Sequence, residues 1–283
     1  MPDNTIAVRL REDYNLFSPA ERKVARVLLQ QYPLAGLETI AQLAQKSAAS
    51  GPTVLRLVSK LGFNGYVSFQ EALRTELDAK LQSPLLRRDP NLMADHQGFA
   101  HTFIGNIQKL LQQTADHLLL EDFETVVEWL GQPRHRLWII GGYITGSLAE
   151  YFCHHLQAIR SQVSLLRPMP RTWVEYVVDM GKNDVLIVFD IRRYWPELQT
   201  LVQLAHERKC RIVLITDQWT SPIASHADII LTAYTEGKSG WDTNVSVMLL
   251  IDTLIAALNN RDWDETKSRL QQLENLRREF NLD

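Results

Sequence analysis

The sequence predicts an α plus α/β protein, with an all-α helix-turn-helix domain at the N-terminus and a five-stranded parallel-sheet α/β domain at the C-terminus. Two observations predict this organisation. Capped amphipathic helices fill the chain up to about residue 82. From Leu137 onward, short apolar runs alternate with amphipathic stretches, the pattern of buried parallel strands joined by helices. We therefore expect domains at residues 1–82 and 134–283, joined by a linker and connecting helices at 83–133.

Capping signals mark the helix starts of the N-terminal domain. Three of them are capping boxes, formed by Ser18 with Glu21, Thr39 with Gln42, and Ser68 with Glu71. A further start is Ser50, which is followed by Gly51-Pro52. Apolar residues recur with helical spacing after each start, so each helix has one side to bury. The sequence predicts a compact unit of four helices.

The two central helices carry the functional prediction. Residues 39–63 read as two short helices joined by a tight turn. The second helix has an apolar stripe that reaches Leu61, and Gly62 follows as a helix stop. Its other face offers hydroxyl and cationic groups, which contact phosphates and base edges in a major groove. The residues expected to contact DNA are Lys46, Ser50, Thr53, Arg56, Ser59 and Lys60.

The charge distribution agrees with a DNA-binding head. No acidic residue stands between Glu38 and Glu71, where three cations give a local charge of +3, although the whole chain carries −3. Residues 1–82 have ten Lys and Arg against eight Asp and Glu, a balance of +2 that leaves −5 for the remainder. A basic module fused to an acidic one suits a nucleic-acid partner. A plain helical bundle with a basic face is the alternative.

Composition excludes several other classes. A hydrophobic fraction of 45% and a charged fraction of 22% in 283 residues are ordinary for a soluble globular protein of two domains. No apolar run reaches membrane-spanning length and the first residues lack a signal-peptide core, so we expect a cytoplasmic protein with no membrane partner. The two cysteines, Cys153 and Cys210, are interpreted as buried thiols. The histidines lack a zinc-site spacing, and we expect neither a metal nor a cofactor.

The C-terminal domain is predicted to bind its ligand after the strands. The five predicted strands are LWII, VSLL, DVLIVF, RIVLIT and DIILT, with helices beginning near Thr145, Arg171, Pro196 and Ser221. Ligands of parallel sheets bind at the carboxyl ends of the strands, and a glycine-containing turn at a helix start favours an anion. The residues expected to contact this ligand are Gly142, Thr145, Ser147, Asp190, Arg192 and Arg193.

Both halves resemble parts of one known family. The segments ERKVARVLL, TIAQLAQKSAASGPTVLRLVSKLGFNGYVSF and EALRTEL resemble, in order, the N-terminal domain of the RpiR/MurR family of bacterial transcription regulators. The strand pattern over about 134–260 resembles the SIS (sugar isomerase) domain that follows it in that family. The resemblance implies a regulator, not an enzyme, that binds operator DNA and senses a phosphosugar. A homodimer or homotetramer is expected, because a helix-turn-helix protein gains affinity from two half-sites.

Two departures from the family pattern affect the expected site. Ala48-Ala49 replaces the usual Gly-Val turn, and Gly51-Pro52 replaces an acidic or alanine pair. After the third strand, Asp190 and the two arginines stand where SIS domains place a hydroxyl-rich run. Arginine offers a planar fork that suits a carboxylate, so a small anionic metabolite is expected, with a carboxylate favoured over a phosphosugar. An ion pair of Asp190 with Arg192 or Arg193 that only holds the loop is the competing interpretation.

Two other functions compete with the regulator. One is a phosphosugar isomerase-type enzyme with an accessory DNA-binding domain, for which Glu150, Glu175 and Glu236 are possible general bases. The other is a DNA-binding dimer whose second domain is structural and binds no effector.

Overall fold

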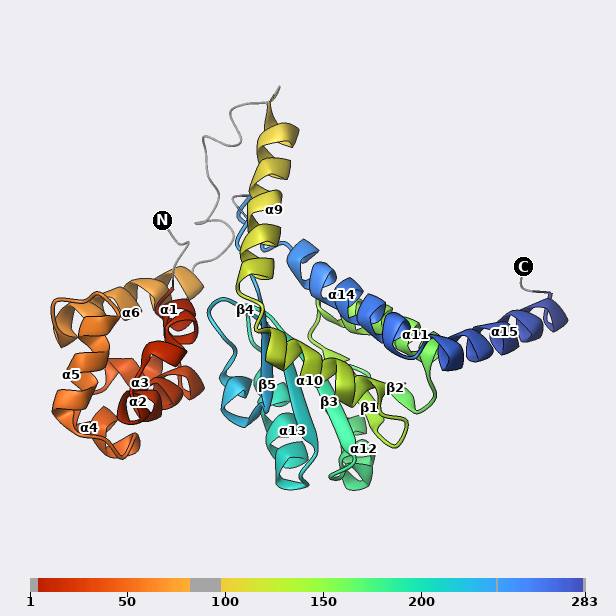
Figure 1. The fold of residues 1–283 in the computed structure, drawn as a ribbon, viewed down its shortest axis with the longest axis horizontal. Helices are drawn as coiled ribbons and strands as arrows, with labels where there is room; N and C mark the ends of the chain where they lie inside the picture. Colours follow the sequence, from red (N-terminus) through yellow and green to blue (C-terminus); the bar gives the residue numbers. More distant parts are fainter. Residues whose placement is uncertain (1–4, 82–97, 238, 282–283) are drawn as a thin grey trace. The chain divides into compact units, whose positions relative to one another are not determined.

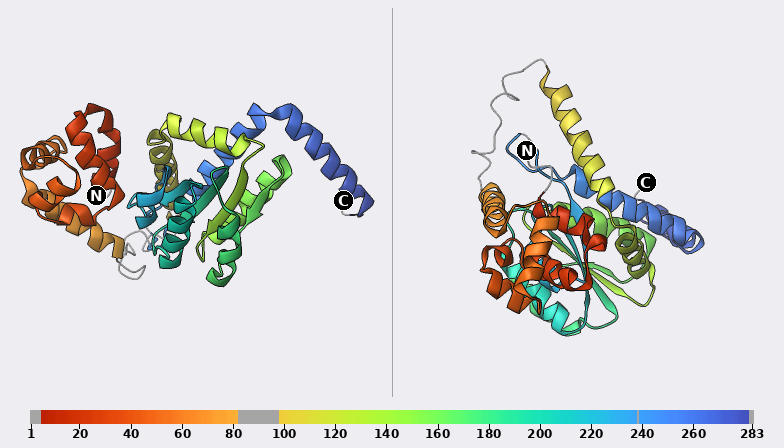
Figure 2. Two further views of the ribbon diagram at one scale, coloured as in Figure 1. Left: turned by 90° about the horizontal axis from the view of Figure 1, so that it is seen from below. Right: turned by 60° about the vertical axis from the view of Figure 1, so that its left-hand side comes forward.

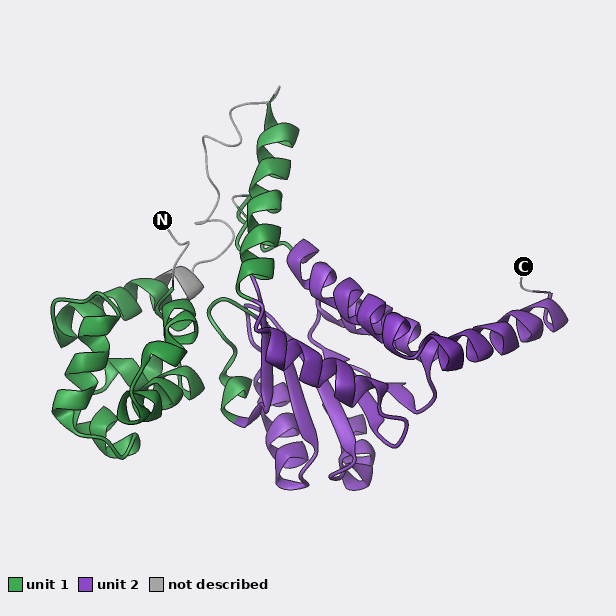
Figure 3. Ribbon diagram, in the orientation of Figure 1, with its two compact units in different colours: residues 1–117, 217–225, 234–243 green, residues 118–216, 226–233, 244–283 purple. Residues whose placement is uncertain are grey.

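The computed structural model describes residues 5–81, 98–237 and 239–281. The chain divides into two compact units (Figure 3). Unit 1 comprises residues 1–117, 217–225 and 234–243, and unit 2 comprises residues 118–216, 226–233 and 244–283. Unit 1 thus contains the N-terminal helices and two later segments, 217–225 and 234–243, each of which follows a strand of unit 2 in the chain. Of the linker and connecting helices expected at 83–133, residues 83–97 lie outside the described residues.

The N-terminal part of unit 1 is helical, as the sequence predicts (Figure 1). Its helices are α1 (Ile6–Glu12), α2 (Pro19–Gln30), α3 (Leu34–Leu37), α4 (Ile40–Lys46), α5 (Gly51–Lys60), α6 (Tyr66–Leu81) and α9 (Phe99–Asp116), with a 3₁₀ helix η1 (Tyr14–Leu16) after α1. The prediction of four helices in the first domain missed α1 and the single turn of α3. Helix α9 lies within residues 83–133, where connecting helices are expected.

Capping geometry explains where these helices begin. The Ser18 backbone N–H donates to the Glu21 carboxylate at 2.7 Å while the Ser18 hydroxyl accepts from the Glu21 N–H, which confirms the first capping box. The box at Thr39 is also confirmed. The box at Ser68 is wrong: α6 begins at Tyr66, and the Ser68 hydroxyl donates instead to the Gly65 carbonyl at 2.9 Å.

The helices enclose an apolar core. Its members come from α1 to α6 and share near-complete burial; they include Ile6, Leu10, Val24, Leu28, Leu43, Val54, Leu57, Leu61, Phe69 and Leu73. The predicted inner faces of α2, α4 and α5 are all in this set, as the helical spacing of apolar residues requires. A Cβ atom at Gly36 in α3 would collide with the Leu73 side chain, so α3 packs directly on α6.

The sheet of unit 2 is five-stranded and parallel, as predicted. Its strands are β1 (Arg136–Gly141), β2 (Val163–Leu165), β3 (Asp184–Asp190), β4 (Arg211–Asp217) and β5 (Ile229–Ala233), in the order β2-β1-β3-β4-β5. The chain moves outward from β1 in one direction to β2 and in the other to β3. The carboxyl ends of β1 and β3 therefore form the topological switch point at which open parallel sheets bind ligands.

Helices cover both faces of this sheet (Figure 2). They are α10 (Leu120–Gly131), α11 (Gly146–Ile159) and α14 (Val245–Arg261) on one face and α12 (Trp173–Asp179) and α13 (Pro196–Glu207) on the other, followed by α15 (Trp263–Glu279). Alternate strand residues, including Ile139, Ile187 and Val213, join the core under α10, α11 and α14. The helix expected near Ser221 is a short 3₁₀ helix, η3 (Pro222–His226).

The interpretation of the two cysteines can be compared with the fold. Cys153 and Cys210 are buried free thiols, as interpreted, and burial raises the pKa of Cys153 to about 11 and that of Cys210 to about 12. None of the helices in the described part of the chain combines the length and the apolar character that crossing a membrane requires. In the same part of the chain, His, Cys, Asp and Glu side chains form no group of three suited to a metal ion.

Candidate nucleic-acid interface and ligand site

The turn between α4 and α5 depends on a left-handed alanine. Ala48 has φ of 46°, a conformation that costs an alanine more than a glycine. The Ala48 N–H donates to the Gln45 carbonyl at 3.1 Å and the Ala49 N–H donates to the Ala44 carbonyl at 2.9 Å, which closes the end of α4. The chain then enters α5 through the Ser50 cap, whose hydroxyl accepts from the Thr53 N–H. Ala48 therefore does permit the turn, at the cost of backbone strain.

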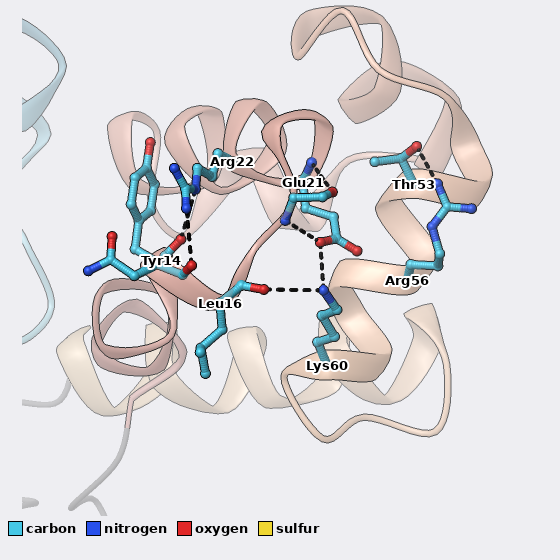
Figure 4. A network of polar contacts seen from close by, with 9 residues as sticks. Tyr14, Leu16, Glu21, Arg22, Thr53, Arg56 and Lys60 are labelled. Atoms are coloured by element: carbon cyan, nitrogen blue, oxygen red, sulfur yellow. Dashed lines mark hydrogen bonds and ion pairs between the residues drawn. The ribbon is translucent and has the colours of Figure 1, made fainter.

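Thr53 does not lie on the exposed face of α5, contrary to the sequence-based expectation. Its side chain is only 4% exposed, because the first turn of α5 rotates it toward the core. The Thr53 hydroxyl oxygen lies 2.8 Å from the Ser50 hydroxyl and accepts from an Arg56 guanidinium nitrogen at 3.0 Å (Figure 4). Thr53 thus orients Arg56, and the exposed face of α5 is instead formed by Pro52, Leu55, Arg56, Ser59 and Lys60.

Lys60 has an acidic partner that sequence spacing did not suggest. Its ammonium group lies 2.8 Å from the carboxylate of Glu21 in α2 and also donates to the Leu16 carbonyl at 3.4 Å (Figure 4). Burial of Glu21 acts to raise its pKa, but the hydrogen bonds from Lys60 and from Ser18 outweigh burial and lower that pKa below its ordinary value. The Lys60 side chain is 46% exposed and Glu21 is buried, so one half of this pair is shielded from water.

The local charge of +3 counted along the sequence is reduced by folding. Lys46, at the end of α4, pairs with the Glu38 carboxylate at 2.6 Å, as Lys60 pairs with Glu21. Within the described residues, the Arg56 guanidinium differs from these two lysines because it donates to a neutral group, the Thr53 hydroxyl. Ser59 is exposed one turn beyond it on the same helix. In the part of the chain that the structure describes, the charge of Arg56 is therefore not offset by a hydrogen-bonded carboxylate, unlike the charges of Lys46 and Lys60.

The turn after β1 is built around the Thr145 hydroxyl. It accepts from the Gly142 N–H at 2.7 Å and donates to the Phe189 carbonyl at 2.9 Å, which ties the turn to the end of β3. A Cβ atom on Gly141 would lie 2.5 Å from the Thr145 carbonyl oxygen, so only glycine fits there. Thr145 is 7% exposed and its hydroxyl already serves the fold. The sequence predicts Thr145 as a ligand contact, but it does not predict that the Thr145 hydroxyl links the turn to the end of β3.

Several groups at the start of α11 are also bonded within the turn. The Gly146 N–H donates to the Gly142 carbonyl at 2.7 Å, and the Leu148 N–H donates to the Thr145 carbonyl at 3.1 Å. Ser147 is exposed, but its hydroxyl donates to the Ile144 carbonyl at 2.9 Å. A helix start binds an anion through backbone N–H groups that lack other partners. Because the Gly146 and Leu148 N–H groups already donate to carbonyls of the turn, they are not available for an anion in this conformation.

The three charged residues expected in the site, at the end of β3, differ in exposure. Asp190 is 3% exposed and its carboxylate accepts from the Trp195 N–H at 3.3 Å. Arg192 is 7% exposed, whereas Arg193 is exposed. The backbone of Arg192 is left-handed, with φ of 52°, and no pattern in the sequence predicts this conformation. Thr216, near the end of β4, donates its hydroxyl to the Asp190 carbonyl at 2.7 Å. Thr216 ends the predicted strand RIVLIT, but it is not among the residues expected in the site.

The tryptophans that follow strands β2 to β5 in the chain differ in exposure. Trp173 is 5% exposed and its ring meets that of Trp195 edge to face, with ring centroids 5.2 Å apart. Trp219 is 2% exposed, whereas Trp241 is 63% exposed. Trp173 and Trp219 are thus buried by this chain itself, and of the four only Trp241 keeps a largely exposed ring for stacking or subunit contact.

Comparison with known proteins identifies both parts of the chain. The helix-turn-helix domain of the rpiR family matches residues 4–80, and the SIS domain matches residues 132–257. An HTH-type transcriptional regulator of Haemophilus influenzae is 23% identical over 262 residues, which cover 89% of this chain and 88% of that protein.

Two solved structures share the fold. NanR of Vibrio vulnificus, complexed with ManNAc-6P, is 22% identical with a TM-score of 0.56 and covers 97% of this chain and 98% of its own. The sugar isomerase domain of an RpiR transcription factor from Sphaerobacter thermophilus is also 22% identical, with a TM-score of 0.60 over 63% of this chain and 99% of its own. The fold and both domains define a helix-turn-helix transcriptional regulator with a SIS domain. The chain belongs to the RpiR family.

Proposed function

We propose that the protein binds operator DNA through the exposed face of α5 and that a small anionic metabolite, bound at the carboxyl ends of β1 and β3, controls this binding. The observation that carries the effector half is the position of Asp190 and Arg192 at the topological switch point of the sheet. Ligand and DNA affinities are then linked reciprocally.

Arg56 is the principal DNA contact in this proposal. It is exposed in the middle of α5, and its guanidinium is oriented by the Thr53 hydroxyl. Ser59 and the start of α5 at Ser50 supply hydroxyl groups near it. Lys46 and Lys60 add positive charge, but each must share that charge with a carboxylate of its own unit.

A carboxylate is the preferred effector, and a phosphosugar is the second candidate. The Thr145 and Ser147 hydroxyls, which resemble a phosphate cradle in sequence, are committed to carbonyl acceptors of the protein. Exposed Arg193 offers a fork for a planar anion at the same edge. The phosphosugar alternative is supported by the fold shared with NanR, which was solved with ManNAc-6P.

We further propose that the protein acts as a homodimer or homotetramer held together through unit 2. Two helix-turn-helix units on one assembly read two half-sites, and α15, which buries only Thr266, leaves an amphipathic surface for a second copy. Gel filtration with light scattering on the full chain tests this; a monomer at micromolar concentration contradicts it.

A thermal-shift comparison tests the effector. The full chain is heated with ManNAc-6P or with each member of a panel of small carboxylates, and a ligand of the native state raises the melting temperature by mass action. Arg193→Gln should abolish the shift given by a carboxylate. Arg171 is an exposed arginine on the 3₁₀ helix η2 (Pro170–Thr172), so Arg171→Gln serves as the matched control. A shift by ManNAc-6P that survives Arg193→Gln refutes the carboxylate proposal.

An activity assay separates the regulator from the enzyme. Incubation with aldose and ketose sugar phosphates should give no interconversion. Turnover that Glu150→Gln or Glu175→Gln removes supports the isomerase-type alternative.

A further inference from the structure

Helix α1 contacts two groups of residues inside unit 1. One group is the helix-turn-helix core, and the other is the pair of loops at 217–225 and 234–243 together with α9. The first loop follows β4 and the second follows β5, so both leave the edge of the sheet at which we place the effector. Figure 3 shows these loops in the colour of unit 1.

The contact of α1 with the loops and α9 has an apolar centre. Val8, which is 3% exposed, clusters with Leu110 of α9 and with Tyr234, which follows β5. Ile107 packs against this cluster one turn before Leu110. Burying Val8 on this side leaves the apolar residues Ile6 and Leu10 for the helix-turn-helix core.

Polar contacts surround this centre. An Arg11 guanidinium nitrogen donates to the Thr220 hydroxyl at 2.8 Å, and the Thr5 hydroxyl donates to the Gln218 carbonyl at 3.4 Å. A Glu12 carboxylate oxygen lies 2.6 Å from His117 Nε2 at the end of α9. Thr220 is held at φ of 60°, in the left-handed region, so Arg11 contacts a constrained part of the loop.

The two loops and α9 are bonded to one another. The Gln218 side-chain oxygen accepts from the Thr235 N–H at 3.1 Å, which links the loop after β4 to the loop after β5. The Tyr234 N–H donates to the Thr114 hydroxyl of α9 at 2.9 Å, and the Tyr234 ring lies 5.0 Å from the His117 ring. A displacement of either loop therefore changes the surface on which α1 rests.

The other side of α1 reaches the DNA-binding helix. An Arg9 guanidinium nitrogen donates to the Leu61 carbonyl, the C-cap of α5, at 2.5 Å and covers the Phe63 ring at 4.6 Å. The Ile6 N–H donates to the Glu76 carboxylate of α6 at 2.8 Å. Helix α1 thus contacts the loops with one set of side chains and the end of α5 with another.

We infer that α1 is the coupling element through which the loops after β4 and β5 and the DNA-binding helix α5 influence each other. The inference rests on the proposed function, because it assigns the path of regulation between the DNA face and the effector edge. Coupling is reciprocal, so DNA binding must change the loops even when no effector has been identified.

Hydrogen exchange on the full chain tests the inference. A DNA duplex is first selected from a random library with the wild-type protein, and exchange is then measured with and without saturating duplex. We expect DNA to change the exchange rates of peptides covering 217–225 and 234–243 by about fivefold or more in the wild type. The double variant Arg11→Gln with Glu12→Gln should bind the duplex and lose most of that change.

Two controls sharpen the result. Arg171→Gln with Glu121→Gln makes the same chemical changes at exposed sites on η2 and α10 and should behave as wild type. Val8→Ala trims the apolar centre without a charge change and should also weaken the response, which covers the case in which the polar double variant is poorly folded.

The outcomes separate the two proposals. A duplex that binds tightly through α5 while the exchange of both loops stays unchanged overturns the coupling inference and leaves DNA binding intact. A loop response that is full-sized in both the polar variant and Val8→Ala also overturns it. Failure to select any duplex refutes the proposed function, and the inference falls with it.

Discussion

Replacing Lys60 by methionine separates a structural role from DNA recognition. The substitution keeps the length and apolar stem of the side chain and removes the cation that faces Glu21 at 2.8 Å. Glu21 is buried and retains its bond from the Ser18 N–H, and Lys60 is half exposed. Breaking a fully buried pair costs about 3–5 kcal/mol and an exposed pair less than about 1 kcal/mol, so we expect a loss of about 1–2 kcal/mol at neutral pH.

The pH dependence of this loss follows from the lowered pKa of Glu21. A carboxyl whose pKa is lower in the folded than in the unfolded state contributes stability above its unfolded pKa and loses it as the pH falls through its folded pKa. Without Lys60, part of that contribution is missing at neutral pH. The stabilities of wild type and Lys60→Met should therefore converge as the pH falls below the ordinary carboxyl range, about 4.

The assay must report on the N-terminal helices of unit 1. All seven tryptophans lie at position 129 or beyond, so tryptophan fluorescence does not follow the N-terminal helices. Hydrogen exchange of amides in α2 and α5 measures their opening free energy directly. In a Glu21→Gln background the same Lys60→Met change should cost much less, which makes a double-mutant cycle. Unchanged protection of α2 and α5, together with a loss of DNA affinity of tenfold or more, refutes the reasoning and returns Lys60 to the recognition surface.

Three further predictions follow from single positions. Ala48→Gly should raise the stability of the helix-turn-helix part by about 0.5–1 kcal/mol in thermal unfolding, because glycine relieves the left-handed strain and loses some of that gain to chain entropy. Gly141→Ala should cost about 3 kcal/mol and abolish effector-induced thermal shifts, because its Cβ atom meets backbone at 2.5 Å; a variant that melts with the wild type contradicts this. Burial raises the pKa of Glu76, so its ionisation destabilises the fold as the pH rises through that raised value; urea titrations should show Glu76→Gln gaining stability relative to wild type over the same rise.

Local signals in the sequence predicted much of the fold. The capping boxes at Ser18 and Thr39 and all five strands are confirmed, because caps and apolar runs act over a few residues. Thr5 is also an N-cap residue, because its hydroxyl accepts from the Val8 N–H, but no helix after it is predicted from the sequence.

The missed features depend on neighbours that are distant in the sequence. Glu21 meets Lys60 across 39 positions, and Arg11 meets Thr220 across 209. The burial of Thr53 depends on how α5 is rotated in its core, and helical spacing alone had placed it on the face opposite the apolar stripe. The left-handed backbone of Arg192 and the position of β1 inside the sheet likewise follow from tertiary packing.

The hydroxyl network at the start of α5 constrains how this regulator can evolve. Ser50 and Thr53 hold both the helix start and the direction of Arg56. Under the proposed function, substitutions there alter folding and DNA preference together. Leu55 and Ser59 are exposed on the same helix, and in the described structure their side chains take no part in that network. If α5 binds the operator as we propose, duplicated copies of the gene can therefore diverge in operator choice through Leu55 and Ser59 while the hydrogen bonds that orient Arg56 are kept.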